Sequence, residues 1–181
     1  MSDLGLLKQF LGLEIEQNFD GIMVTQSKCI SNILVNFNMA ECNAAPFPFL
    51  LGINLEEGKS TPPMDYTIYR QLIGSLLYLT HSQPDIYYAM NFVSRYMQKP
   101  YDIHWKEANR ILQYMQGTRT YDIHYAAGFE LELVGYTDSD WAGDSINQKY
   151  TFGYVFMFGG GPILWSSKKQ ASISLSSVEA K

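Results

Sequence analysis

Apolar residues recur with two different periods along this chain, and the change of period divides it. Over roughly the first two thirds, apolar positions lie three and four apart, which is the spacing of a helix with one buried face. From Ile123 onward apolar and polar residues alternate, which is the spacing of a strand. The pattern therefore predicts a largely helical part followed by a β-sheet.

Four stretches carry the helical period. The first runs from Ser27, which we expect to cap it, to about Asn38. Pro84 and Pro100 separate the later stretches, and Gly117 lies where the last helix should end. The apolar stripes are Ile30, Ile33, Leu34 and Phe37; Tyr69, Leu72, Ile73, Leu76 and Leu77; Ile86, Ala89, Met90, Val93 and Met97; and Trp105, Ala108, Leu112 and Met115. Such stripes are typical of a packed core, so they predict a helical bundle without chemistry of its own.

A β-hairpin is predicted before the helices. Two short apolar runs, Phe10–Glu16 and Gly21–Gln26, flank a turn in which Asp20 and Gly21 can supply positive backbone angles. A long irregular connector rich in proline and glycine then spans Ala44–Pro63.

Three strands are predicted in the last third, over Leu131–Asp138, Phe152–Phe158 and Ile163–Ser167. Gly159-Gly160-Gly161-Pro162 lacks the lysine and hydroxyl residue of a phosphate-binding loop, so it is interpreted as a turn between strands. The final residues, 175–181, are predicted to form the first turns of a helix.

Composition and charge narrow the function. With 46% hydrophobic and 17% charged residues in 181, the chain is globular and not disordered. Its net charge of −5 argues against a general binder of polyanions. Residues 95–119 nevertheless carry a local balance of +3, and residues 130–144 hold five acids and no base. This fits either phosphate contacts in one place and metal ions in another, or two ordinary solvated surfaces.

The remaining reactive residues give little signal. Cys29 and Cys42 lack the spacing of a zinc site or a disulfide framework. His81, His104 and His124 have no partners that would indicate a catalytic triad, so each is interpreted as structural or exposed. No signal peptide and no membrane span is evident, which predicts a cytoplasmic or nuclear protein that is not secreted.

Several motifs, in one order, resemble those of copia-type retrotransposon Pol polyproteins. They are Asp3–Gly12; Tyr69–Leu79; Arg95–Met97; His104–Lys106 with Arg110–Tyr114; Gly135–Asp144; Trp165–Gln170; and Ser176–Ala180. The resemblance implies an α+β chain in which 1–126 is the thumb/connection-like end of a reverse transcriptase. It implies that 127–181 begin a truncated ribonuclease H-like mixed sheet.

The same resemblance assigns a partial metal site to Asp138 and Glu179. Ribonuclease H cleavage uses divalent metals held by clustered carboxylates. One aspartate on the first strand and one glutamate on the first helix match these two residues. Strand alternation puts Asp138 and Asp140 on the same side of the strand, so Asp140 could take the place of Asp138 if the expected register is wrong. Without the resemblance, Asp138, Asp140 and Asp144 would be interpreted as turn and capping residues.

The resemblance also implies what this chain lacks. By this resemblance the further acids of the nuclease would follow Lys181, and the paired aspartates of the polymerase would precede Asp3. Tyr150 and Phe152 stand in a stretch between the first two strands that is hydroxyl-rich in the family. We therefore expect Mg²⁺ in the intact family, but weak binding or none here, and no catalysis.

The expected partner is an RNA–DNA hybrid or duplex nucleic acid, bound weakly, with no membrane and no small-molecule substrate. Arg95 and Lys99, and likewise Lys106 and Arg110, lie four apart and should share a helix face that contacts phosphates. Three functions stay open: an inactive retroelement remnant, a component that is active only in a longer polyprotein, and a host-recruited module that binds nucleic acid or protein.

Overall fold

The computed structural model describes residues 5–50, 52–53, 55–140 and 151–169, and the chain divides into two compact units. The first comprises Met1–Glu16 and Val24–Asp122, and the second comprises Gln17–Met23 and Ile123–Lys181. The described elements mix helices with antiparallel strands, which confirms the α+β class. The predicted boundary near residue 126 concerns the Pol domains and stays a prediction.

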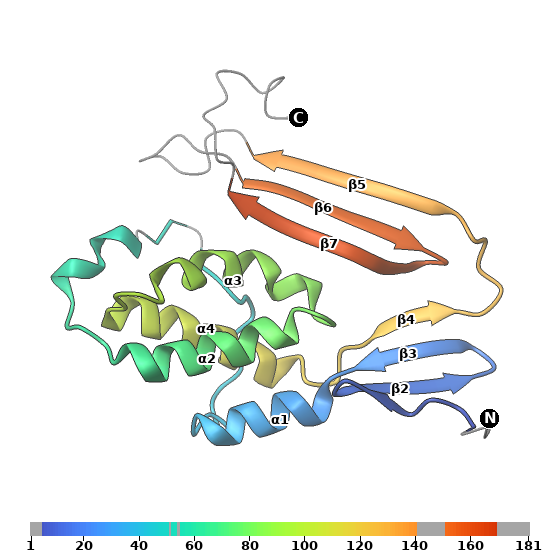
Figure 1. Cartoon of the computed structure of the whole chain (residues 1–181), viewed down its shortest axis with the longest axis horizontal. Coiled ribbons are helices and arrows are strands. Elements are labelled where there is room, and N and C mark those ends of the chain that lie inside the picture. The colour runs from blue at the N-terminus through green and yellow to red at the C-terminus, as the bar shows by residue number, and fades with distance from the viewer. Residues whose placement is uncertain (1–4, 51, 54, 141–150, 170–181) are drawn as a thin grey trace. The chain divides into compact units, whose positions relative to one another are not determined.

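The first unit is built from the helices α1 (Ser27–Asn36), α2 (Tyr66–Leu79), α3 (Tyr87–Val93) and α4 (Asp102–Gly117) (Figure 1). Short 3₁₀ turns lie at η1 (Leu55–Ser60), η2 (Pro84–Ile86) and η3 (Ser94–Tyr96). The predicted stripes meet in one core, in which Leu72, Ile73 and Leu76 are fully buried. The buried Tyr69 hydroxyl donates to the carbonyl of Val93 at 2.7 Å, so this buried polar group has a hydrogen-bond partner.

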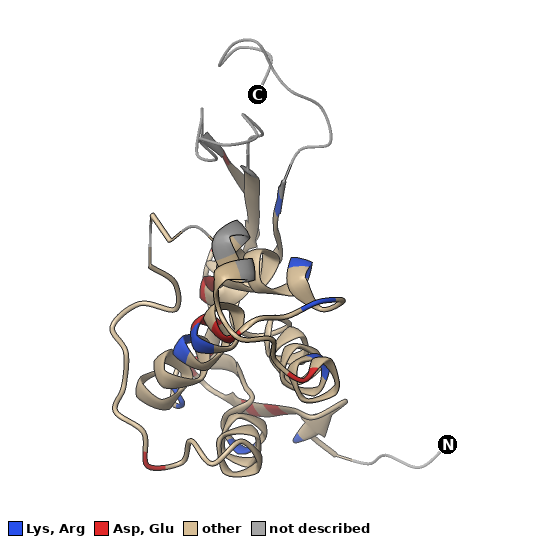
Figure 2. Cartoon of the chain, turned by 90° about the vertical axis from the view of Figure 1, so that its left-hand side faces the viewer, with Lys and Arg blue, Asp and Glu red and all other residues tan. Residues whose placement is uncertain are grey.

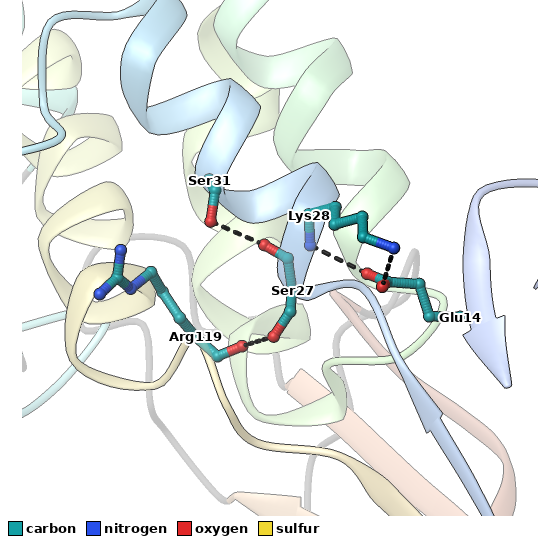
Figure 3. Close-up of polar contacts among 5 residues, drawn as sticks. All are labelled: Glu14, Ser27, Lys28, Ser31 and Arg119. Atoms are coloured by element: carbon teal, nitrogen blue, oxygen red, sulfur yellow. Dashed lines mark hydrogen bonds and ion pairs between the residues drawn. The ribbon is translucent and has the colours of Figure 1, made fainter. Parts of the chain in front are cut away.

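The start of α1 is held differently from the prediction (Figure 3). Ser27 does not cap the helix; its hydroxyl donates to the carbonyl of Arg119 at 2.5 Å. Glu14, from β2 (Leu13–Asn18), instead accepts the backbone N–H of Lys28 at 3.0 Å and pairs with the Lys28 ammonium at 2.9 Å. A carboxylate from a strand thus satisfies an N–H in the first helical turn. These contacts lower the pKa of Glu14.

The predicted hairpin is confirmed, with two turns in place of one. A sheet of order β1-β2-β3-β4 joins β1 (Gln9–Phe10), β2, β3 (Gly21–Thr25) and β4 (Ile123–Ala126). Between β1 and β2, Leu11 and Gly12 have φ of 46° and 79°.

The turn between β2 and β3 is organised by the side chain of Asn18. Its carbonyl oxygen accepts the N–H groups of Asp20 and Gly21. Only Gly21 of the Asp-Gly pair has a positive φ, at 142°. A Cβ there would lie 2.1 Å from the carbonyl oxygen of Tyr125, so only glycine fits.

The second unit contains the three predicted strands, as β5 (Leu133–Asp140), β6 (Thr151–Phe158) and β7 (Gly161–Lys169). They form an antiparallel sheet of order β5-β6-β7 (Figure 1). The turn predicted over 159–162 is shorter than expected: Gly159 and Gly160 have positive φ, whereas Gly161 and Pro162 already belong to β7. All described pairings are antiparallel, so the mixed, ribonuclease H-like sheet stays a prediction. The expected helix at 175–181 lies outside the described residues, as do Asp144 and Tyr150.

Candidate nucleic-acid and metal-binding residues

Asp138 lies near the end of β5, where it pairs with Gly153 of β6, and its side chain is exposed. This is the strand position that the sequence predicted for the nuclease aspartate. Asp140 lies two positions further, opposite Thr151, in the same strand as predicted. A hard cation at this end of the sheet would find a carboxylate oxygen on Asp138.

A metal site needs more than this one carboxylate. Glu179, the second predicted ligand, lies outside the described residues, so its approach to Asp138 stays a prediction. Within the parts of the chain that the structure describes, no group of three His, Cys, Asp or Glu residues could hold a metal ion. The described residues therefore do not by themselves fit a two-metal centre, and no catalytic step is assigned through one.

Arg95 and Lys99 do not share a helix face, so this part of the prediction is wrong. α3 ends at Val93, Arg95 lies in η3, and Lys99 follows in an irregular turn. Pro100 disfavours helical backbone at the residue before it, which is Lys99. The guanidinium of Arg95 lies over the ring of Phe92, 4.4 Å from its centroid.

Lys106 and Arg110 both lie on α4 with the predicted spacing, but acids accompany them. The Lys106 ammonium is 2.8 Å from the carboxylate of Asp102, one turn earlier. Glu107 lies between the two cations in sequence, and burial raises its pKa, while the charge of Arg110 lowers it by less. Figure 2 shows the same interleaving of basic and acidic residues among the helices. α4 is therefore not a purely cationic surface.

A third arginine meets the segment that carries Lys99, and the sequence prediction missed it. Arg70 on α2 donates through Nε to the carbonyl of Met97 at 2.9 Å. Its guanidinium also lies 5.1 Å from the ring centroid of Tyr66, one turn earlier. The spacing of Tyr66 and Arg70 could have suggested this stacking, but nothing local in the sequence indicates the contact with Met97.

His104 is a structural residue, as predicted. Its Nδ1 accepts the backbone N–H of Tyr101 at 2.9 Å, and its Nε2 lies 2.8 Å from the carbonyl oxygen of Leu55. These partners require a neutral ring with the proton on Nε2. The ring stacks on Tyr96 with centroids 3.9 Å apart, and burial lowers the pKa of His104. It ties η1 to the start of α4.

None of the described helices has the length and apolar character that crossing a membrane would require. Cys29 and Cys42 are free thiols, and burial raises the pKa of both.

The chain is similar to transposon proteins over nearly all of its length. It is 38% identical to the retrovirus-related Pol polyprotein from transposon RE2 of Arabidopsis thaliana, over 97% of the chain. It is also 38% identical to the one from transposon TNT 1-94 of Nicotiana tabacum, over 100% of the chain. The chain covers only 12% and 14%, respectively, of these two polyproteins.

A shorter relative is covered far more completely. An uncharacterised mitochondrial protein of Arabidopsis thaliana is 33% identical over 100% of the chain, which covers 75% of that protein. No family model matches the chain, and no solved structure matches it significantly.

Proposed function

The chain belongs to the copia-type, retrovirus-related Pol polyproteins of transposons, and we propose that it is the connecting segment between their reverse transcriptase and ribonuclease H. In this proposal 1–126 is thumb/connection-like and 127–181 begins a ribonuclease H domain. The observation that carries the proposal is the similarity of nearly the whole chain to a short part, 12% and 14% of the length, of two long Pol polyproteins. The position of Asp138 on β5 supports the nuclease assignment.

As an isolated chain, the protein binds nucleic acid weakly and catalyses neither polymerisation nor hybrid cleavage. Two-metal chemistry needs several clustered carboxylates, and the resemblance assigns only Asp138 and Glu179 of this chain to them. Primer extension, and cleavage of an RNA–DNA hybrid with Mg²⁺, should both stay at the level of heat-inactivated protein. Hybrid cleavage that disappears in Asp138→Asn would contradict the proposed inactivity.

The proposed nucleic-acid contacts are Arg95, Lys99, Lys106 and Arg110, to which the geometry adds Arg70. Each cation that meets a phosphate releases counterions, so binding should weaken with salt at a slope of roughly −0.9 per contact on B-DNA. Asp102 already neutralises Lys106, and Arg95 is stacked on Phe92. The slope should therefore correspond to fewer contacts than five.

Fluorescence anisotropy with a labelled RNA–DNA hybrid, measured over a salt series, tests these contacts. The combined alanine variant of Arg95, Lys99, Lys106 and Arg110 should lose most of the affinity and flatten the salt slope. Lys8→Ala, which removes an exposed charge elsewhere, is the control and should bind nearly as well as the wild type. Salt-independent binding, or equal affinity of the two variants, would rule out this surface.

A second function is favoured by the short mitochondrial relative, of which the chain covers 75%. A segment of this type thus makes up most of a separate small protein, which fits a host-recruited binding module. Under that function the chain would bind its nucleic acid without any longer polyprotein. The anisotropy experiment on the isolated chain separates the two functions by affinity, because a segment of a longer polyprotein should bind only weakly by itself, whereas an independent binding module should bind tightly.

A further inference from the structure

We propose that three cations, Arg70, Arg95 and Lys99, form a cation cluster that binds neighbouring phosphates of a single nucleic-acid strand. The cluster rests on the proposed nucleic-acid binding and narrows it to one part of the helical unit. Arg95 and Lys99 flank Met97 in sequence, and Arg70 of α2 donates through Nε to the carbonyl of Met97 at 2.9 Å. The fold therefore brings a cation from α2 to the turn that carries the other two.

The turn after η3 is held in place at two points. The carbonyl of Met97 accepts the bond from Arg70, and the carbonyl of Pro100 accepts the backbone N–H of Met64 at 3.0 Å. Lys99 lies between these two points with an exposed side chain, whereas Pro100 is buried. Because the backbone is fixed on both sides of Lys99, a ligand that binds there has little chain to order.

Both guanidinium groups of the cluster lie against aromatic rings. Arg95 lies 4.4 Å from the ring centroid of Phe92, and Arg70 lies 5.1 Å from that of Tyr66. These contacts restrict each guanidinium plane, and a planar set of N–H groups matches two oxygens of one phosphate. Since only the Nε of Arg70 is used by Met97, its terminal N–H groups remain for a phosphate.

The cluster differs in charge from the cationic positions of α4. In the described part of the chain, no carboxylate forms an ion pair with any of the three cations, and all three side chains are exposed. Asp65 accepts two backbone N–H groups at the start of α2, and Asp102 pairs with Lys106. On α4, Glu107 also lies between Lys106 and Arg110. A phosphate therefore meets uncompensated positive charge at the cluster and a mixture of charges on α4.

The small extent of the cluster favours one strand over a duplex. Arg95 and Lys99 are separated by four residues of tight turn, which corresponds to roughly 8 Å of chain at the rise of a 3₁₀ helix. A flexible single strand can bend its neighbouring phosphates around so compact a group. Beside Arg70, the ring of Tyr66 is 56% exposed and offers a stacking surface to an unpaired base, which a paired base cannot use.

Fluorescence anisotropy of the full chain tests the cluster with a labelled single-stranded DNA and an RNA–DNA hybrid of the same sequence. The single strand should bind at least as tightly as the hybrid. The combined alanine variant of the three cations should weaken binding of the strand by roughly tenfold or more and reduce the salt slope by roughly 0.7 for each cation removed. The matched control is the double variant of Lys106→Ala and Arg110→Ala, which should bind nearly as well as the wild type.

A conservative pair of substitutions tests the role of the guanidinium planes. Arg70→Lys with Arg95→Lys keeps both charges but removes the planar groups, so the salt slope should stay while the affinity falls several-fold. Full affinity in this variant would contradict the role assigned to the stacked arginines. Circular dichroism that matches the wild type verifies that each variant is folded.

The outcomes separate the cluster from the proposed function. Equal losses in the cluster and α4 variants, or hybrid binding clearly tighter than strand binding, would overturn the cluster and leave the proposed nucleic-acid binding standing. Displacement of the strand by inorganic phosphate at constant ionic strength would also overturn it, because the cations would then bind single phosphates and not a backbone. No binding of either nucleic acid would overturn both.

Discussion

Replacing Glu107 by glutamine should stabilise the helical unit at neutral pH, although it removes a negative charge near Arg110. Glu107 lies on α4 and is only 6% exposed. One of its carboxylate oxygens, Oε2, is buried and has no hydrogen-bond partner among the described residues. Burial raises the pKa of this carboxyl, and the nearby Arg110 compensates only in part. The ionised side chain is therefore a cost of folding.

The size of the effect follows from that unpaired oxygen. Leaving a buried polar atom without a partner costs about 1–3 kcal/mol, and an ionised one is at the upper end. Glutamine has nearly the same shape and keeps one polar atom unpaired, so we expect a gain of about 1 kcal/mol. For a chain of this size the corresponding rise in Tm is about 2–4 °C.

The gain should depend on pH. Because the folded pKa of Glu107 is raised, the wild type bears the full cost above that pKa and none below the unfolded value of about 4.3. The stability difference between Glu107→Gln and the wild type should therefore shrink as pH falls toward that value. Urea unfolding at several pH values measures this difference, and Glu16→Gln, at an exposed position, is the control that should stay within about 0.5 kcal/mol of the wild type.

Two results would refute the reasoning about Glu107. If the glutamine variant were less stable at neutral pH, the carboxylate would have a favourable partner, with Arg110 as the first candidate. A difference that stays constant between acidic and neutral pH would mean that ionisation is not the source of the effect.

Two further substitutions test the contacts that hold the helices in place. Glu14→Gln should destabilise the chain by about 1 kcal/mol, because it weakens the bonds to Lys28. Since the folded pKa of Glu14 is lowered, this difference in stability should vanish as pH falls through that pKa. His104→Ala should cost about 2–4 kcal/mol in urea unfolding, because it removes two hydrogen bonds and the stack on Tyr96. Because the folded pKa of His104 is lowered, its contribution to the free energy of unfolding is complete above about pH 6.5 and should decline as pH falls. If the loss of stability in the Glu14 or the His104 variant does not change with pH, the role assigned to that residue is contradicted.

The spacing of apolar residues predicted the helices and strands well, because the formation of each element depends on residues only a few positions apart in sequence. The stripes of α2 and α4 and the alternation in β5–β7 appear at nearly the expected positions. The end of α3 was missed by four residues, since the apolar spacing continues to Met97 although the helix ends at Val93.

Contacts between distant segments were beyond this reasoning. Serine is a residue type that often caps helices, so Ser27 was expected to do so. Glu14, thirteen residues earlier, instead accepts a backbone N–H at the start of α1, because the hairpin brings it there. The stack of Arg70 against Tyr66 follows a local spacing, whereas its bond to Met97 depends on how α2 lies against the turn after η3. The candidate site is predictable only in part for the same reason. The strand position of Asp138 follows from the local alternation of residues, but whether Glu179 approaches it would depend on the tertiary fold.

The ends of the helical segment lie next to each other, since the Ser27 hydroxyl bonds to Arg119 and the Thr25 hydroxyl lies 3.4 Å from the carbonyl of Tyr121. A segment whose entry and exit points adjoin can be inserted into a host loop, or removed from one, without separating the ends of that loop. Residues 25–121 therefore suit transplantation into an unrelated scaffold, and rejoining their ends by a short peptide would permit circular permutation at the connector between α1 and α2.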